Sequence, residues 1–93
     1  MYRIKSHKKF EKGLEKLKKK GLKQKHVDGL YLVIGILSKG GKLGLEYHDH
    51  KLRGEYEGFR ECHIQGDLLL VYQIIKDELV LVLIDIGTHS YLF

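Results

Sequence analysis

Apolar residues recur at a helical spacing in the first part of this 93-residue chain. Phe10, Leu14 and Leu17 lie at positions i, i+4 and i+7 with lysines between them, which predicts an amphipathic helix with one apolar face. Gly21 is expected to end this helix. The weak alternation of residues 1–5 before it predicts a short strand.

A second helix is predicted a few residues later. Its apolar positions recur at the same spacing and are Val27, Leu30, Tyr31, Ile34 and Leu37. Residues 38–41 (Ser-Lys-Gly-Gly) are expected to end it, because glycine accepts the left-handed end of a helix. Ser6 is expected to cap the first helix, which would then begin at His7. Helices joined by so short a connection predict an antiparallel hairpin.

The pattern changes in the second half of the chain. Residues 42–58 show no sustained period and predict a long surface loop with one helical turn. Tight turns at 65–67 and 76–78 then separate three β-rich segments, residues 59–64, 68–75 and 79–86. The middle segment is almost entirely apolar, as expected of a central strand covered on both faces.

This order of elements predicts one α+β domain over residues 1–93. Two N-terminal helices should pack on one face of a mainly antiparallel, twisted sheet. No linker, repeat or low-complexity segment divides the chain. Its 43% hydrophobic and 31% charged residues are the composition of a folded globular protein.

The net charge of +5 is unevenly distributed. Residues 1–25 hold ten Lys and one Arg against two Glu, a local charge of +9, whereas residues 26–93 hold six basic and ten acidic residues, which gives −4. A concentrated positive surface attracts polyanions, and it equally attracts an acidic protein partner. The alternative is a solvated lysine-rich face that serves solubility.

Several absences in the sequence point to a cytoplasmic protein without a membrane segment. No apolar run approaches the ~20 residues that cross a bilayer. The N-terminus lacks the apolar centre of a secretory signal. The single cysteine, Cys62, cannot form an internal disulfide, as suits a reducing compartment.

Some of the six histidines stand where predicted strands begin and end. His63 ends one strand, Asp67 precedes the next, and His89 follows the last. In an antiparallel meander these three points meet at one end of the sheet, so we expect the three side chains to lie close together. Imidazoles suit proton transfer at neutral pH, and a neighbouring carboxylate can orient one of them. His7 and His26 lie in the lysine-rich part and are expected to be exposed.

This combination fits cleavage of RNA without a metal. Such cleavage needs a base for the 2′-hydroxyl, an acid for the leaving 5′ oxygen, and positive charge near the phosphate. Histidines can supply the acid and the base, and Arg60 or Arg53 the phosphate contact. Residues 48–50 (His-Asp-His) are the alternative, a metal site, but the chain has no second cluster with ligand spacing and no paired cysteines. No metal is therefore expected, and Cys62 is expected to pack inward.

Four segments carry a resemblance to a known family. They are residues 47–54 (YHDHKLRG), 58–64 (GFRECHI), 67–72 (DLLLVY) and 87–93 (GTHSYLF). In order and spacing they resemble the signature of YafQ-like toxins in the RelE/ParE superfamily, D-H-x-L-x-G, R-E-C-H-I, D-W-L-L-x-Y and G-T-H-S-x-L-F. The resemblance extends over essentially the whole chain, because the strand, helix, helix, meander order of the RelE-like fold also fits.

The resemblance implies the toxin of a type II toxin–antitoxin pair. Such a toxin is an endoribonuclease, or mRNA interferase, that needs no metal or cofactor and cuts messenger RNA in the ribosomal A site. The expected products are a 2′,3′-cyclic phosphate or 3′-phosphate and a 5′-hydroxyl. The toxin is expected to be a monomer alone and a hetero-oligomer with its cognate antitoxin. The implied active-site residues are His50, His63, Asp67, His89 and Phe93.

A further set of residues is expected to bind RNA. Arg60 is a candidate from its place in the R-E-C-H-I match, and Arg53 lies in the loop before it. The lysine-rich face of residues 8–25 is expected to contact ribosomal RNA, with Lys16, Lys19 and Lys23 as representative positions.

The chain departs from the family pattern at three places. Leu68 stands where a tryptophan is common, which puts a stacking role at this position in doubt. Asp85 lies just before the G-T-H-S segment, where relatives often have an arginine, so phosphate binding shifts to Arg60 or the lysines. The usual proline after the second helix is absent, which affects loop rigidity more than chemistry.

Each implied site residue also has a structural alternative. Phe93 can be a core residue, His50 can fix its own loop through hydrogen bonds, and Asp67 can be only a turn residue. For the whole chain, the alternatives are a non-catalytic ParE-like binding protein on the same scaffold and a toxin-like domain that has lost its activity. ParE-like relatives bind DNA gyrase and lack this histidine set, so the histidines favour the enzyme.

Overall fold

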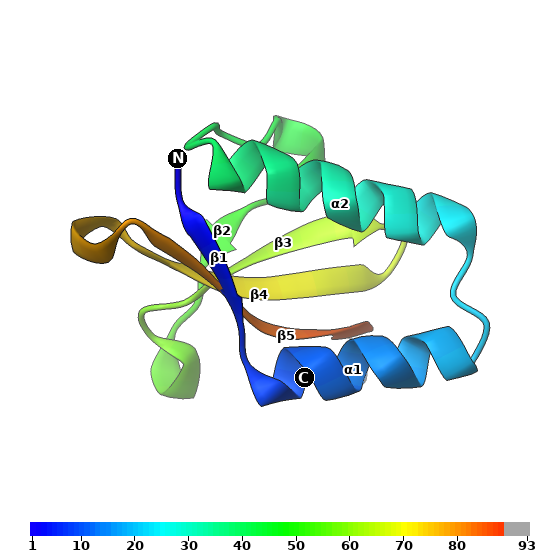
Figure 1. Ribbon diagram of the computed structural model, residues 1–93. Coiled ribbons are helices and arrows are strands. Elements are labelled where there is room, and N and C mark those ends of the chain that lie inside the picture. The colour runs from blue at the N-terminus through cyan, green and yellow to red at the C-terminus, as the bar shows by residue number, and fades with distance from the viewer. Residues whose placement is uncertain (89–93) are drawn as a thin grey trace.

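Residues 1–88, which the computed structural model describes, form a five-stranded sheet with two helices packed against it (Figure 1). The strands, in chain order, are β1 (Arg3–Ser6), β2 (His50–Lys51), β3 (Arg60–Gln65), β4 (Leu68–Ile75) and β5 (Val80–Thr88). Across the sheet the order is β1-β5-β4-β3-β2. β1 pairs in parallel with β5, and the other three pairs are antiparallel. The predicted α+β fold with a mainly antiparallel sheet is confirmed.

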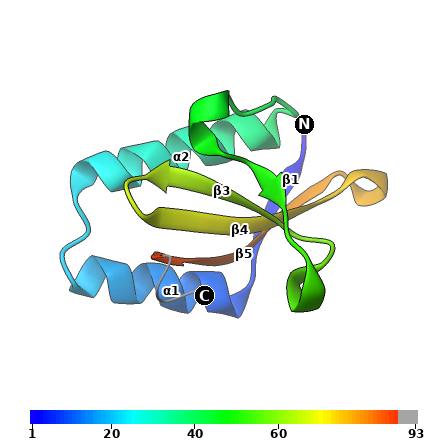
Figure 2. The ribbon, with the colours of Figure 1, turned by 180° about the vertical axis from the view of Figure 1, so that it is seen from behind.

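The helices α1 (Lys8–Lys19) and α2 (Gln24–Ser38) run in opposite directions, as Figures 1 and 2 show. α1 lies along β5 and α2 lies along β3. The helices thus have the opposite directions expected of an antiparallel hairpin, but each of them packs on a different strand and not mainly on the other helix. None of the helices in the described part of the chain is long and apolar enough to span a membrane.

The core lies between the helices and one face of the sheet. Phe10 of α1 and Leu30 and Val33 of α2 are buried there against inward-facing residues of β3, β4 and β5. Gly13 lets α1 approach β5 closely, since a Cβ at this position would lie 2.6 Å from the backbone oxygen of Ile86. Any other residue at this position would push α1 away from the sheet.

The first helix and its cap each begin one residue later than predicted. Ser6 was expected to cap α1 but remains in β1, where it pairs with Leu83. His7 is the N-cap instead, because its Nδ1 accepts a hydrogen bond of 3.1 Å from the backbone N–H of Lys9. The Ser6 hydroxyl donates to the carboxylate of Glu11 at 2.6 Å. Parallel pairing with β5 overrides the local capping preference of the serine.

The segment expected to be a long loop contains more structure than the sequence predicts. Two 3₁₀ turns, η1 (Leu45–Tyr47) and η2 (Gly54–Tyr56), flank the two-residue strand β2. A strand of two residues carries no alternation, so its pattern does not show in the sequence. The predicted turn at 76–78 is a third 3₁₀ turn, η3 (Lys76–Glu78).

Candidate active site

The ends of β3, β4 and β5 meet at one end of the sheet, as predicted for the meander; we call this end the strand-end edge. Leu68, the first residue of β4, pairs with Gln65 at the end of β3 and with Thr88 at the end of β5. Asp67 immediately precedes Leu68 and is exposed at this edge. His89 follows Thr88 in the sequence and lies outside the described residues, so its expected place beside Asp67 stays a prediction.

Alternation along β3 separates its core residues from its polar ones. Cys62 and Ile64 are buried in the core on the helix side of the sheet. Glu61 and His63 therefore point to the opposite face, which we call the distal face. The inward packing predicted for Cys62 is confirmed. Burial, helped by the charges of Asp49 and Glu61, raises the pKa of its thiol to about 12, so the thiol is no nucleophile at neutral pH.

Two elements bring histidines together on the distal face. The ring of His48, between η1 and β2, contacts the ring of His63 in β3 edge to face, with centroids 5.2 Å apart. His50 in β2 is the register partner of Glu61, and its Nε2 lies 3.4 Å from the Glu61 Oε1. Three imidazoles and one carboxylate thus gather on this face.

The orientation of His50 is fixed at both ring nitrogens. Its Nδ1 lies 2.7 Å from the backbone oxygen of His48, and a carbonyl oxygen only accepts, so Nδ1 carries a hydrogen and donates it. His48 itself has a left-handed backbone with φ of 47°, a strained conformation for a residue with a side chain. His50 therefore makes the hydrogen bond within its own loop that the alternative, structural role predicts.

The residue between the two histidines ties the loop to the helix side of the sheet. Asp49 accepts a hydrogen bond of 2.9 Å from Arg60 Nη2 and one of 2.5 Å from the hydroxyl of Tyr72, which is buried in the core. The hydrogen bond to Asp49 raises the pKa of Arg60. Burial, followed by the contact with Asp49, raises the pKa of Tyr72. These contacts hold the His48–His50 segment against the sheet.

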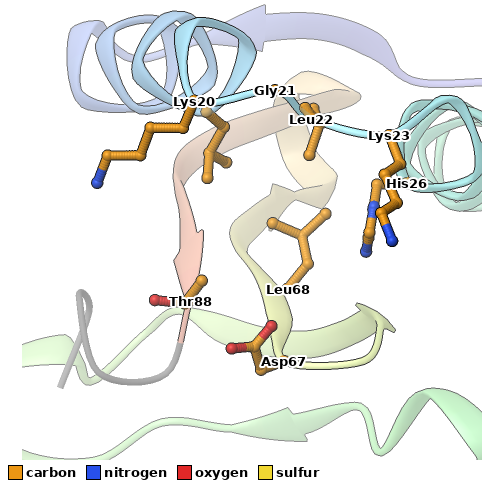
Figure 3. Close-up of a pocket in the computed structure, with 9 residues that line it drawn as sticks. Lys20, Gly21, Leu22, Lys23, His26, Asp67, Leu68 and Thr88 are labelled. Atoms are coloured by element: carbon orange, nitrogen blue, oxygen red, sulfur yellow. The ribbon is translucent and has the colours of Figure 1, made fainter.

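A shallow pocket of about 200 Å³ opens beside the strand ends (Figure 3). It lies between the connection of the two helices and the edge that carries Asp67 and Thr88. We call it the basic pocket, and its lining residues are Leu17, Lys20, Gly21, Leu22, Lys23, His26, Asp67, Leu68 and Thr88. A smaller hollow of about 100 Å³, lined in part by Lys16 and Lys20, adjoins it along α1. Lysine side chains thus line the pocket on the side opposite the strand-end carboxylate.

Residues 2–93 of the sequence match a family model. The model describes a bacterial toxin of type II toxin–antitoxin systems, YafQ, and it covers residues 2–93. The chain belongs to the YafQ toxin family. The predicted family is confirmed, and with it the RelE-like fold, since solved toxin structures match the whole of this chain with TM-scores of 0.84 and 0.87.

Three similar proteins illustrate the relationship. The mRNA interferase toxin YafQ of Escherichia coli K12 is 35% identical over 63 residues, which are 68% of this chain and 66% of that protein. The crystal structure of a metal-bound toxin from Helicobacter pylori is 46% identical over the whole of both chains, with a TM-score of 0.87. The E. coli DinJ–YafQ complex is 26% identical, with a TM-score of 0.84, and the match covers 100% of this chain and 99% of that one. Segments aligned with the curated relatives span 32% to 66% of their lengths.

The catalytic residues expected of a YafQ-family toxin fall into three groups. His50 and His63 lie on the distal face in the same cluster of side chains. Asp67 lies at the strand-end edge, beside the basic pocket. His89 and Phe93 lie outside the described residues.

The residues expected to bind RNA are dispersed over the molecule. Arg60 is paired with Asp49, which occupies its Nε and one Nη2 hydrogen. Arg53 is exposed just before η2. Lys23 lines the basic pocket and Lys16 the smaller hollow. Lys19 is exposed and lies 3.5 Å from Glu15.

Three further residues lie at the candidate site that were given no role in RNA cleavage or binding from the sequence. Glu61 is buried beside His50, and His48 touches His63. A signal for Glu61 was available, since it stands two residues before His63 and so faces the same side of β3. His26, expected to be exposed, is half-buried and lines the basic pocket, and no residue of 1–88 reaches its buried Nδ1.

The His-Asp-His segment considered as a metal site is divided between two faces of the sheet. Asp49 turns to Arg60 and Tyr72, away from the two imidazoles beside it. Within residues 1–88 no three His, Cys, Asp or Glu side chains are arranged to hold a metal ion.

Proposed function

We propose that this YafQ-family toxin is an endoribonuclease that cuts messenger RNA. The observation that supports this most is the cluster of His48, His50 and His63 beside the buried Glu61 on one face of the sheet. Grouped imidazoles provide proton acceptors and donors at neutral pH. The name mRNA interferase, carried by the E. coli relative, points to the same activity.

The reaction follows from the chemistry of RNA. A base removes the proton of a 2′-hydroxyl, the 2′ oxygen bonds to phosphorus, and the bond from phosphorus to the 5′ oxygen breaks. An acid protonates that oxygen, which leaves a 5′-hydroxyl and a 2′,3′-cyclic phosphate. Water can then open the cyclic product to a 3′-phosphate. No step of this scheme needs a cofactor.

We assign the proton transfers to His63 and His89. His50 assists at the phosphate, where its half-exposed ring can meet the substrate. Asp67 orients one of the histidines from the strand-end edge, and Phe93 positions the messenger. The assignments of His89 and Phe93 rest on the G-T-H-S-x-L-F segment that follows β5.

The RNA strand is proposed to cross the strand-end edge toward the basic pocket. Lys20 and Lys23 line this pocket on the side opposite Asp67, so a phosphate there would meet cations. Arg60 retains N–H groups beyond those that Asp49 occupies, and Arg53 is exposed nearby in the sequence. Lys16 and Lys19 extend the positive surface along α1, where we propose a contact with ribosomal RNA.

We further propose that the toxin works in the cytoplasm on messenger RNA bound in the ribosomal A site. Its cognate antitoxin would silence it in a hetero-oligomer, an arrangement suggested by the DinJ–YafQ complex of the E. coli relative. The free toxin is expected to be a monomer. Growth of a bacterial host should stop when the toxin is expressed alone and continue when the antitoxin is co-expressed.

The experiment that tests the function compares naked messenger RNA with the same messenger on programmed ribosomes. We expect cleavage on the ribosomes, little cleavage of the naked RNA, and 5′-hydroxyl ends. A non-catalytic ParE-like protein would leave the messenger intact under both conditions, and this outcome would refute the proposal.

A further inference from the structure

Glu61 is a buried carboxylate with few partners. Its side chain is 6% exposed, and within residues 1–88 its Oε1 lies 3.4 Å from His50 Nε2. Within the same residues no donor reaches Oε2, which is also buried. Burial of a carboxylate is costly unless it is paired or hydrogen-bonded. Burial of the Glu61 carboxylate therefore lowers the stability of the fold.

A second carboxylate in the same region shows what a structural role looks like. Asp49 receives hydrogen bonds from Arg60 and from Tyr72, and it ties the loop to the sheet. Within residues 1–88, the side chain of Glu61 has no comparable pair of hydrogen bonds. Its backbone pairs with His50 and Val71 through the sheet ladder, for which the side chain is not needed. A neutral side chain would fill the same space at lower cost.

The side chain of Glu61 contacts the ring of His50. Nδ1 of His50 donates to the backbone oxygen of His48, which leaves Nε2 directed toward Glu61. When the ring is protonated, both nitrogens are donors, and each of them finds an acceptor. An opposite charge at this range favours the charged form of an ionisable group.

We propose that Glu61 is a positioning residue that holds His50 and stabilises its protonated form during RNA cleavage, a role that rests on the proposed nuclease function. The proton stays on His50 Nε2, and Glu61 keeps its negative charge throughout. The half-exposed ring then presents a positive charge to the phosphate, while the buried carboxylate stays out of reach of the substrate.

Single-turnover cleavage of a messenger on programmed ribosomes tests this role. Glu61→Gln keeps the shape and removes the charge, so we expect a rate about 10-fold below the parental rate. The half-saturating ribosome concentration should not change, and the melting temperature should not fall. Glu61→Asp, which keeps the charge, should retain more of the rate than Glu61→Gln. Glu57→Gln, at an exposed site in the preceding loop, serves as the matched control and should cut like the parent.

A double-mutant cycle with His50 separates positioning from mere structure. In a His50→Ala background, Glu61→Gln should cause no further loss, because the group it acts through is gone. Equal losses in both backgrounds, a parental rate for Glu61→Gln, or a variant that unfolds would each overturn the role of Glu61. A parental protein that cuts no RNA would instead overturn the nuclease function itself.

Discussion

The ring of His48 meets the ring of His63 edge to face, with the two centroids 5.2 Å apart. His48 lies in the connection between η1 and β2, and His63 lies in β3, so the contact joins this connection to the sheet at the proposed site. His48 makes the contact from a left-handed backbone conformation. Backbone strain of this kind is often retained where function requires it.

Replacing His48 by glycine should separate strain from function. Glycine accepts the left-handed backbone, so His48→Gly should stabilise the fold by about 0.5–1 kcal/mol. It should also slow cleavage several-fold, because His63 loses its neighbouring ring. Urea unfolding and single-turnover cleavage measure the two effects. Leu79→Gly is the matched control, since Leu79 has a φ of 54° in the distant turn after η3 and should gain stability without loss of activity. If both variants cleave at the same rate, His48 does not contribute to the site.

Asp49 should matter for stability more than an ordinary surface acid does. Asp49→Ala leaves the Tyr72 hydroxyl and the Arg60 guanidinium without their shared acceptor. The loss should be about 1–3 kcal/mol, the usual cost of a buried donor left unsatisfied. Asp77→Ala, in the exposed turn η3, should change the free energy of unfolding much less. Equal effects of the two variants in urea unfolding would mean that the Asp49 contacts contribute nothing.

Cys62 should be chemically silent in the folded protein. Burial raises the pKa of its thiol from 9.0 to about 12, so the folded state holds the proton more tightly than the unfolded state. The resulting stability is complete below pH 9 and is lost as the pH rises from 9.0 toward 12. Iodoacetamide at pH 8 should therefore label Cys62 rapidly in urea and slowly without it. Fast labelling of the folded protein would contradict the buried position, and no other cysteine can supply the signal.

Ribosome binding should depend on salt if Lys16, Lys19 and Lys23 contact ribosomal RNA. Reversal of Lys16, Lys19 and Lys23 to Glu together should weaken binding and make the dependence on salt shallower, by a slope of roughly one for each lost phosphate contact. Single reversals distinguish the positions. Lys23→Glu, in the basic pocket, should cost more than Lys19→Glu, which has Glu15 beside it. An unchanged salt slope in a ribosome pelleting assay would mean that these lysines serve solubility alone.

Local patterns were enough to predict the framework of the fold. The stripe of Phe10, Leu14 and Leu17 packs on the sheet, and the apolar segments of residues 68–75 and 79–86 lie in β4 and β5. The meeting of the strand ends followed from the order of the strands alone. These features depend on periodicity and chain order, which the sequence carries directly.

Local sequence patterns could not predict contacts between residues that are distant in the sequence. Arg60 resembles a free phosphate-binding arginine in the sequence, but the fold pairs it with Asp49, eleven positions earlier. Glu61 resembles an exposed residue of an alternating strand, yet the pairing of β2 with β3 buries it beside His50. β2 has only two residues, so its sequence does not predict that pairing.

Cleavage of a messenger on programmed ribosomes by the parent, His89→Ala and His50→Ala tests the central claim most directly, with melting followed in parallel. The parent should cut and leave 5′-hydroxyl ends. His89→Ala should lose on the order of 10²–10⁴-fold in rate, the usual contribution of a proton-transfer group, and should lose more than His50→Ala. Its melting temperature should stay close to that of the parent. Cleavage by His89→Ala at the parental rate, or no cleavage by the parent, would contradict the account.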